Sequence, residues 1–136
     1  MDYKAQYQIY LSQVSSALEN ACERFLPENS EVCRAARYSL LSGGKRIRAV
    51  LTLSVCEMLG GDMDAARSFS AAVEMLHCYS LIHDDLPCMD NDDLRRGRPS
   101  CHKAFGEATA MLAGDVLLTE AFDAIANAPA SAQARV

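Results

Sequence analysis

The sequence predicts an all-α fold of about five helices, and three observations support this prediction. Half of the residues are hydrophobic, but only 7% are aromatic and Trp is absent. The remaining apolar residues are mainly Ala, Leu, Val and Met, a mixture that favours helices over sheets. Apolar residues also recur at helical spacing along most of the chain, and Pro or paired Gly residues separate the periodic segments.

The first two helices are expected over residues 3–26 and 31–42. In the first segment apolar side chains recur every three or four positions, and Pro27 ends it because proline cannot continue a helix. The second segment ends at Gly43 and Gly44, which are residues typical of a helix terminus. These boundaries leave only a short connection between the two helices.

Three further helices are expected over residues 45–59, 64–86 and 103–127. A pair of glycines closes the first of these at residues 60–61. Residues 87–101 contain two Pro, one Gly and many charges, and are expected to form a loop. The pattern contains no convincing strand, repeat or linker.

The residues after Asn127 read as the opening of another helix, which Ser131 would cap. The chain is therefore expected to stop where a larger fold continues. On this interpretation residues 1–136 form the N-terminal portion of a single domain rather than a complete one.

Composition and charge exclude several classes of function. A formal net charge of -5 is a poor match to nucleic acid or to an anionic membrane surface. No run of about 18 apolar residues predicts a transmembrane helix, and the polar start lacks the apolar centre of a signal peptide. The six cysteines form no C-x-x-C pair, so we expect free thiols in a cytoplasmic protein rather than disulfides or a zinc site.

Residues 43–48, Gly-Gly-Lys-Arg-Ile-Arg, predict a site for a diphosphate. Two glycines let a ligand approach the backbone closely, and the start of the next helix presents free N–H groups and the positive end of its dipole. Lys45 and Arg48 are three positions apart and are expected to share a helix face. The alternative is a helix terminus followed by a solvated basic turn, and this motif alone leaves both open.

Asp84, Asp85 and Asp90 lie at the end of an apolar segment and predict a metal site. Clustered carboxylates repel one another and need a cation, and hard oxygen ligands select Mg²⁺ or Ca²⁺. A regular helix would place Asp90 about 240° round from Asp84. Pro87 breaks that helix, so the chain can return Asp90 towards Asp84.

Two alternatives compete with this interpretation of the aspartates. An EF-hand calcium loop is excluded, because Leu94 and Arg95 occupy positions that require other residues. A solvated acidic loop stays open if the aspartates are considered alone. His77 lies two helical turns before Asp84 on the same face, where it can reach a phosphate, although a hydrogen-bonded core histidine would fit the same position.

Arginines directly after the aspartates favour a phosphate ligand. Arg95, Arg96 and Arg98 follow within a few residues. Magnesium can take carboxylates on one side and phosphate oxygens on the other, while arginines bind further phosphate oxygens. Adjacent Arg95 and Arg96 must point in different directions, so they can serve two phosphate groups. The alternative is Asp–Arg pairing at the surface, which contributes little stability.

Residues 43–48, 77–97, 105–107 and 113–115 together resemble the trans-prenyl diphosphate synthases. The resemblance covers essentially the whole chain. It is specific, because terpene cyclases and squalene synthases share a related aspartate cluster but lack both the Lys45–Arg48 segment and the Asp-Leu-Arg-Arg-Gly run. It implies the N-terminal half of an all-helical isoprenoid synthase fold.

The resemblance also implies a Mg²⁺-dependent prenyl transfer. An allylic diphosphate, dimethylallyl or geranyl, binds through Mg²⁺ held by Asp84 and Asp90, with Asp85 as a further ligand. It ionises to an allylic cation, the double bond of isopentenyl diphosphate attacks that cation, and a proton is lost. Arg95 is expected to bind the allylic diphosphate. The residues expected to bind isopentenyl diphosphate are Lys45, Arg48, His77 and Arg96.

The resemblance extends to product length. In this family the residue five positions before the first aspartate helps to form the floor of the chain pocket, and here it is Tyr79. A bulky aromatic residue there resembles the bacterial farnesyl diphosphate synthases, whereas a small residue or Met would indicate a C20 product. One departure is Ala49, where the family usually has Pro, which affects local rigidity rather than phosphate contacts.

The family carries a second aspartate-rich motif in a C-terminal half that this chain lacks. We therefore expect the intact parent protein to be the enzyme and this chain alone to be inactive. The alternatives are a geranylgeranyl diphosphate synthase or a non-catalytic fragment that acts as a binding module. Helices that normally pack against the missing half would expose apolar faces, so a homodimer or higher self-association is expected.

Overall fold

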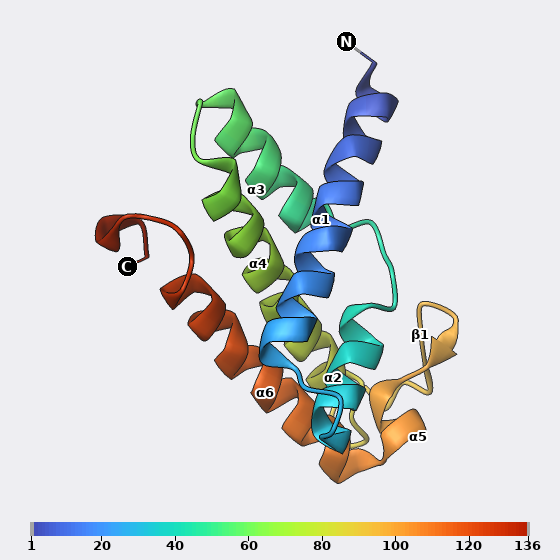
Figure 1. Ribbon diagram of the computed structural model, residues 1–136. Coiled ribbons are helices and arrows are strands. Elements are labelled where there is room, and N and C mark those ends of the chain that lie inside the picture. The colour runs from blue at the N-terminus through green and yellow to red at the C-terminus, as the bar shows by residue number, and fades with distance from the viewer. Residues whose placement is uncertain (1, 136) are drawn as a thin grey trace.

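The computed structural model describes residues 2–135 and confirms the predicted all-α fold (Figure 1). A two-stranded antiparallel ladder pairs β1 (Leu94–Arg95) with β2 (Arg98–Pro99), and a 3-10 turn, η1 (Ala132–Arg135), follows the last helix. The α-helices of the described residues are α1 (Tyr3–Phe25), α2 (Glu31–Leu40), α3 (Ile47–Met58), α4 (Met63–Asp84), α5 (Cys101–Phe105) and α6 (Glu107–Ala126).

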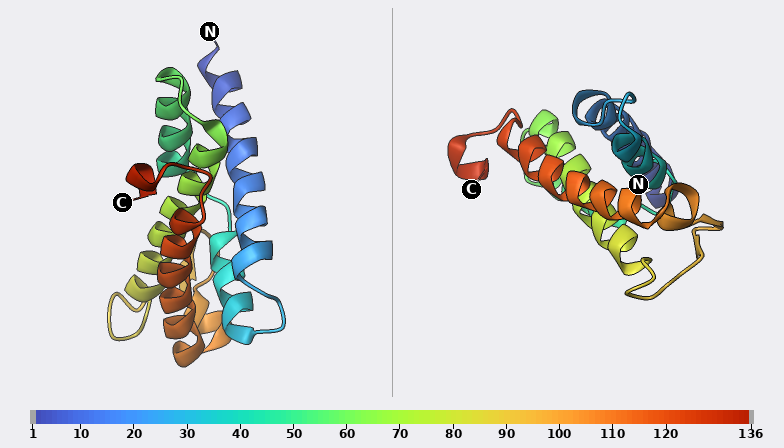
Figure 2. Two further views of the ribbon diagram at one scale, coloured as in Figure 1. Left: turned by 60° about the vertical axis from the view of Figure 1, so that its left-hand side comes forward. Right: turned by 90° about the horizontal axis from the view of Figure 1, so that it is seen from below.

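Helix α4 is the centre of the bundle and packs against α1, α2, α3 and α6. Figure 2 shows these helices running along the long axis of the molecule, with the segment after α6 projecting to one side. The core between them is closely packed and aliphatic, and its largest fully buried side chains include Leu18, Leu40, Leu53, Met75 and Leu117. Burial of this apolar surface is the main stabilising contribution.

Side-chain caps explain where three of the helices begin. The Asp2 carboxylate accepts a hydrogen bond of 2.9 Å from the Lys4 N–H at the start of α1. Ser30 caps α2, and Asp62 caps α4 by accepting from the Asp64 N–H at 2.8 Å. Each cap satisfies a backbone donor that has no partner within its helix.

The predicted boundaries are wrong at two positions, and the backbone shows why. Helix α3 begins at Ile47 rather than Lys45, because Gly44 and Arg46 have φ values of 117° and 51°, outside the right-handed helical region. The predicted helix over 103–127 is divided at Gly106, whose φ is 87°. The loop predicted over 87–101 also holds the short β1–β2 ladder, although no strand was expected.

Large apolar side chains are exposed on several helices. On α6 they are Met111, Leu112 and Phe122. On α3 they recur every three or four positions and form one stripe: Ile47, Leu51, Val55 and Met58. This agrees with the expected exposure of apolar helix faces. None of the helices in residues 2–135 has both the length and the apolar character needed to cross a membrane.

All six cysteines are free thiols in the structure. Burial raises the pKa of Cys22 to about 11 and that of Cys78 to about 12. These thiols therefore stay protonated near neutral pH, and their role is packing rather than chemistry.

Candidate active site

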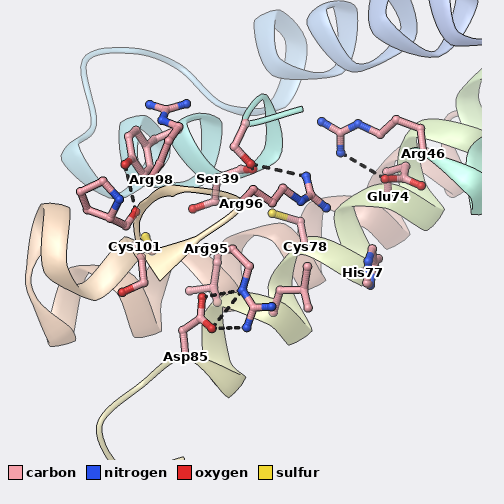
Figure 3. Close-up of a pocket in the computed structure, with 16 residues that line it drawn as sticks. Ser39, Arg46, Glu74, His77, Cys78, Asp85, Arg95, Arg96, Arg98 and Cys101 are labelled. Carbon is pink, nitrogen blue, oxygen red and sulfur yellow. Dashed lines mark hydrogen bonds and ion pairs between the residues drawn. The ribbon is translucent and has the colours of Figure 1, made fainter. Parts of the chain in front are cut away.

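A pocket lies between α2, α4 and the β1–β2 ladder, and several charged side chains are part of its lining (Figure 3). The structure brings four of the predicted site residues into its wall, and these are His77, Asp85, Arg95 and Arg96. Two further charged residues in the wall, Arg46 and Glu74, had no role in the sequence prediction. The pocket therefore joins residues from three separate stretches of the chain.

The acidic end of α4 folds back on itself after Pro87. Asp84 is the last residue of α4, and its carbonyl oxygen accepts a hydrogen bond of 2.8 Å from the Asp90 N–H. The Leu86 carbonyl accepts from the Met89 N–H at 2.8 Å and closes the turn. The predicted return of Asp90 towards Asp84 is confirmed for the backbone.

The donors at this turn fit a magnesium ion that is shared with a substrate. Both carboxylates offer hard oxygen ligands, and Asp84 lies at the helix end where the dipole is negative. Among residues 2–135 no group of three or more His, Cys, Asp or Glu side chains is arranged to hold an ion. The metal role of Asp84 and Asp90 stays a prediction.

Asp85 faces the pocket and pairs with Arg95. Its side chain is 3% exposed, and both carboxylate oxygens lie 3.1 Å from the Arg95 Nε (Figure 3). This pairing is the main cause of the raised pKa of Arg95, and the Asp92 carboxylate at 3.6 Å adds to it. Asp85 therefore has a partner within the protein, and its role as a metal ligand stays a prediction.

Arg96 points away from Arg95 towards the loop that precedes α3, as predicted for adjacent residues (Figure 3). It donates hydrogen bonds to the Gly43 carbonyl and to the Ser42 hydroxyl. A Cβ atom at Gly44 would lie 2.7 Å from the guanidinium, so only glycine allows this approach. Partial burial, followed by the charge of Arg46, lowers the pKa of Arg96.

Lys45 and Arg48 are both exposed at the start of α3. The prediction that they share a helix face is wrong, because Lys45 precedes the helix and belongs to the loop. The Tyr7 hydroxyl donates a hydrogen bond to the Lys45 carbonyl, which ties this loop to α1. Within residues 2–135 neither the Lys45 nor the Arg48 side chain forms an ion pair, so both are available to an anion.

Tyr79 is half-buried on α4 but does not line this pocket. Its ring meets the His83 ring edge to face, with centroids 5.7 Å apart. The His83 Nε2 lies 3.0 Å from the Met111 carbonyl oxygen on α6. Tyr79 and His83 therefore fix the packing on the side of α4 that faces α6.

His77 lies half-buried on α4 beside the basic loop. Burial, followed by the positive charge of Arg48, lowers its pKa below the ordinary value of 6.5. Near pH 6 the unfolded chain therefore binds more protons than the folded one, so the free energy of unfolding rises with pH through this window. The stability contributed by neutral His77 is fully present above pH 6.5 and is lost as the pH falls through its folded-state pKa.

We expect inorganic pyrophosphate to raise the pKa of His77, because a bound anion stabilises the imidazolium. The measurement is the NMR titration of the His77 ring with and without pyrophosphate. The control is a His77→Gln variant, which identifies the signal and should lack the pH-dependent change in stability. An unchanged His77 titration in saturating pyrophosphate would contradict a site for anions beside this residue.

Sequence reasoning missed Arg46 and Glu74. Arg46 was treated as part of a basic segment, whereas its side chain turns inward and pairs with Glu74 (Figure 3). A signal for Glu74 was available, because it is a lone acid within the apolar run from Ala71 to Leu76. A charged residue in such a run is buried only when it has a partner.

Comparison with known proteins identifies the family. Residues 29–136 match the family model described as polyprenyl synthetase. Over 118 residues the chain is 55% identical to the large subunit 1 of the heterodimeric, chloroplastic geranylgeranyl pyrophosphate synthase of Arabidopsis thaliana. This match covers 87% of the chain and 31% of that relative.

Two solved structures have the same fold. A geranyltransferase from Legionella pneumophila superposes with a TM-score of 0.86 at 43% identity, covering 92% of this chain and 43% of that one. An FPP/GFPP synthase from Zymomonas mobilis gives a TM-score of 0.83 at 40% identity, covering 90% and 45%. The chain thus spans about a third of the curated relative and less than half of either solved chain. On its sequence and its all-helical isoprenoid synthase fold, the chain belongs to the polyprenyl synthetase family.

Proposed function

We propose that the protein containing this chain is a prenyltransferase that condenses an allylic diphosphate with isopentenyl diphosphate. The observation that carries this proposal is the arrangement around Asp84 and Asp85. Asp84 belongs to an acidic turn suited to a divalent cation, and Asp85 belongs to a pocket rich in arginine. An acidic site and a basic site at one helix end suit a substrate with a diphosphate leaving group.

In this proposal Asp84 and Asp90 would hold Mg²⁺, and the bound ion would supply positive charge that stabilises a departing diphosphate. Arg95, oriented by Asp85, binds the same diphosphate and stabilises its developing charge. The allylic C–O bond breaks, and its electron pair leaves with the diphosphate. The double bond of isopentenyl diphosphate then attacks the allylic cation, and loss of a proton completes the product.

In the same proposal, the diphosphate group of the second substrate binds at the basic loop of residues 43–48. Arg48 and Arg96 lie close enough to His77 to lower its pKa, and Lys45 belongs to the loop before α3 that Arg96 contacts. The imidazole of His77 can donate a hydrogen bond to an anion there. The absence of a side chain at Gly44 leaves room for the Arg96 guanidinium beside the loop. The expected ligand at this position is isopentenyl diphosphate.

The test uses a chimera in which residues 1–136 replace the matching part of the Legionella geranyltransferase, together with the isolated chain. We expect the chimera to incorporate labelled isopentenyl diphosphate into an acid-labile product in the presence of Mg²⁺. We expect the isolated chain to show no turnover, because it spans less than half of the solved relatives. A folded chimera that binds neither diphosphate would favour the non-catalytic alternative.

Farnesyl diphosphate is the proposed product, on the basis of Tyr79. The competing product is geranylgeranyl diphosphate, which is the product in the name of the Arabidopsis relative. A bulky half-buried ring on α4 would limit the length of a growing chain, whereas a smaller residue would leave more room.

We expect a Tyr79→Ala chimera to shift the main product from C15 to C20, because removing the ring opens space for one more isoprene unit. The measurement is chromatography of the dephosphorylated products. The control is Tyr3→Ala, which removes a tyrosine side chain that is 77% exposed on α1. Unaltered C15 product from Tyr79→Ala, or C20 product from the unmodified chimera, would contradict the assignment.

Self-association and a cytoplasmic location are part of the same proposal. The exposed stripe on α3 gives an apolar surface that a second chain could cover. The free cysteines agree with a reducing compartment. Light scattering of the isolated chain would test self-association, because a chain that is monomeric at all concentrations would contradict it.

A further inference from the structure

Arg46 differs from its basic neighbours in the direction of its side chain. Lys45 and Arg48 are exposed, whereas the side chain of Arg46 is only 9% exposed. Its backbone has a φ of 51°, a left-handed conformation that is uncommon for a residue other than glycine. This conformation reverses the chain between Lys45 and the first turn of α3, and it persists only when the surroundings hold it.

Glu74 on α4 is the partner that holds Arg46. Its side chain is 2% exposed and lies 3.1 Å from the Arg46 guanidinium (Figure 3). The other oxygen of Glu74 lies 3.4 Å from the Ala49 N–H, in the first turn of α3. A single buried carboxylate therefore contacts both the loop and the helix that follows it.

The second guanidinium nitrogen of Arg46 extends this connection to α2. It donates a hydrogen bond to the Leu40 carbonyl, which is at the last residue of that helix. Arg46 and Glu74 thus link the end of α2, the loop, the start of α3 and the middle of α4. Residues 41–46 are not helical, and the other side-chain contacts to this segment are the Tyr7 hydrogen bond to the Lys45 carbonyl and the Arg96 hydrogen bonds to Ser42 and Gly43.

A contribution to stability alone does not explain such a pair. Desolvation of two buried charges offsets much of their attraction, and apolar residues of similar volume often replace a buried ion pair without loss of stability. Apolar residues cannot reproduce the directional hydrogen bonds that the two charged side chains form. The forked guanidinium and the carboxylate fix the loop in one conformation, whereas apolar contacts would allow several.

We infer that Glu74 is a positioning residue, which acts through Arg46 to hold the Gly43–Arg48 loop so that Lys45 and Arg48 face a diphosphate together. This inference rests on the proposed function for the identity of the ligand, but the ordering of the loop does not depend on it. Glu74 and Arg46 need not touch the ligand. They determine the geometry of the residues that do.

Amide hydrogen exchange of the isolated chain tests the ordering of the loop without any ligand. The Ala49 N–H faces Glu74, and the Val50 N–H donates to the Arg46 carbonyl at 2.9 Å. We expect Glu74→Gln to speed exchange at both amides by about tenfold or more, while the amide of Leu117 in the α6 core is unchanged. Exchange rates of the Ala49 and Val50 amides that are the same in Glu74→Gln as in the unmodified chain would overturn the inference.

Calorimetric titration with inorganic pyrophosphate at low salt tests the consequence for binding. We expect Glu74→Gln to weaken affinity about tenfold, the scale of one lost charged hydrogen bond. Glu23→Gln is the matched control, because it removes an exposed ion pair with Arg37 and should leave affinity unchanged. In a Lys45→Ala/Arg48→Ala background the effect of Glu74→Gln should shrink to less than about twofold, because a positioning residue acts only through those two side chains.

The double variant Arg46→Met/Glu74→Met separates positioning from stability. We expect it to keep the thermal midpoint of the unmodified chain and still bind pyrophosphate about tenfold more weakly. Full affinity in this folded variant would overturn the inference. If the unmodified chain fails to bind pyrophosphate, the proposed function loses its ligand, while the exchange at Ala49 and Val50 still decides the role of Glu74.

Discussion

Replacing Asp84 and Asp90 together with Asn in the active chimera is expected to reduce turnover by roughly a thousandfold or more, the scale of a lost catalytic metal. Asn keeps the shape of each side chain but removes the negative charge that a divalent cation requires. The Asp90 N–H and the Asp84 carbonyl remain in place, so the turn after α4 should keep its fold. The measurement is the initial rate of condensation as Mg²⁺ is varied.

The matched control for this pair is Asp64→Asn. Asp64 belongs to the first turn of the same helix, where it forms an exposed pair with Arg67 far along the sequence from the acidic turn. We expect this variant to keep its rate and its magnesium dependence, because exposed pairs contribute little. Unimpaired condensation by the Asp84→Asn/Asp90→Asn chimera would remove the basis of the proposed function.

Gly114→Ala is expected to destabilise the chain by about 1–3 kcal/mol, the usual cost of overpacking a core. A Cβ atom at Gly114 would collide with the imidazole ring of His83, which lies between α4 and α6. Relief would require the ring to leave its contact with the Met111 carbonyl or the two helices to separate. The measurement is denaturant unfolding followed by circular dichroism.

A second variant identifies the cause of this effect. In a His83→Ala background there is no ring to collide with, so Gly114→Ala should cost much less than it does in the unmodified chain. If Gly114→Ala lowers the free energy of unfolding equally in both backgrounds, the loss of stability does not arise from the contact with His83. His83 directly precedes Asp84. Gly114→Ala alone should therefore also weaken the magnesium dependence of the chimera, and this effect would couple helix packing to the proposed metal site.

Most of the fold could be predicted from local patterns. The order of the long helices and the break after Pro87 depend on residues within a few positions of one another. The boundaries that failed lie beside Gly44 and Gly106, where the backbone takes positive φ values. Helical periodicity does not reveal these interruptions, and at Gly44 the guanidinium of the distant Arg96 also approaches the backbone.

For the candidate site, too, some features follow from local sequence and others depend on contacts between distant residues. Local patterns indicate which residue types lie before α3 and after α4, because a lysine and arginine segment followed by aspartates and further arginines suits a divalent cation and a diphosphate. Packing of the helices sets which of these side chains face solvent and which form pairs inside the protein. Arg46 turns towards Glu74, and Asp85 towards Arg95, because a charge buried by helix packing must find its opposite nearby. Arg46 and Glu74 are 28 positions apart in the sequence, and Asp85 and Arg95 are 10 apart, so helical periodicity does not reveal either pair.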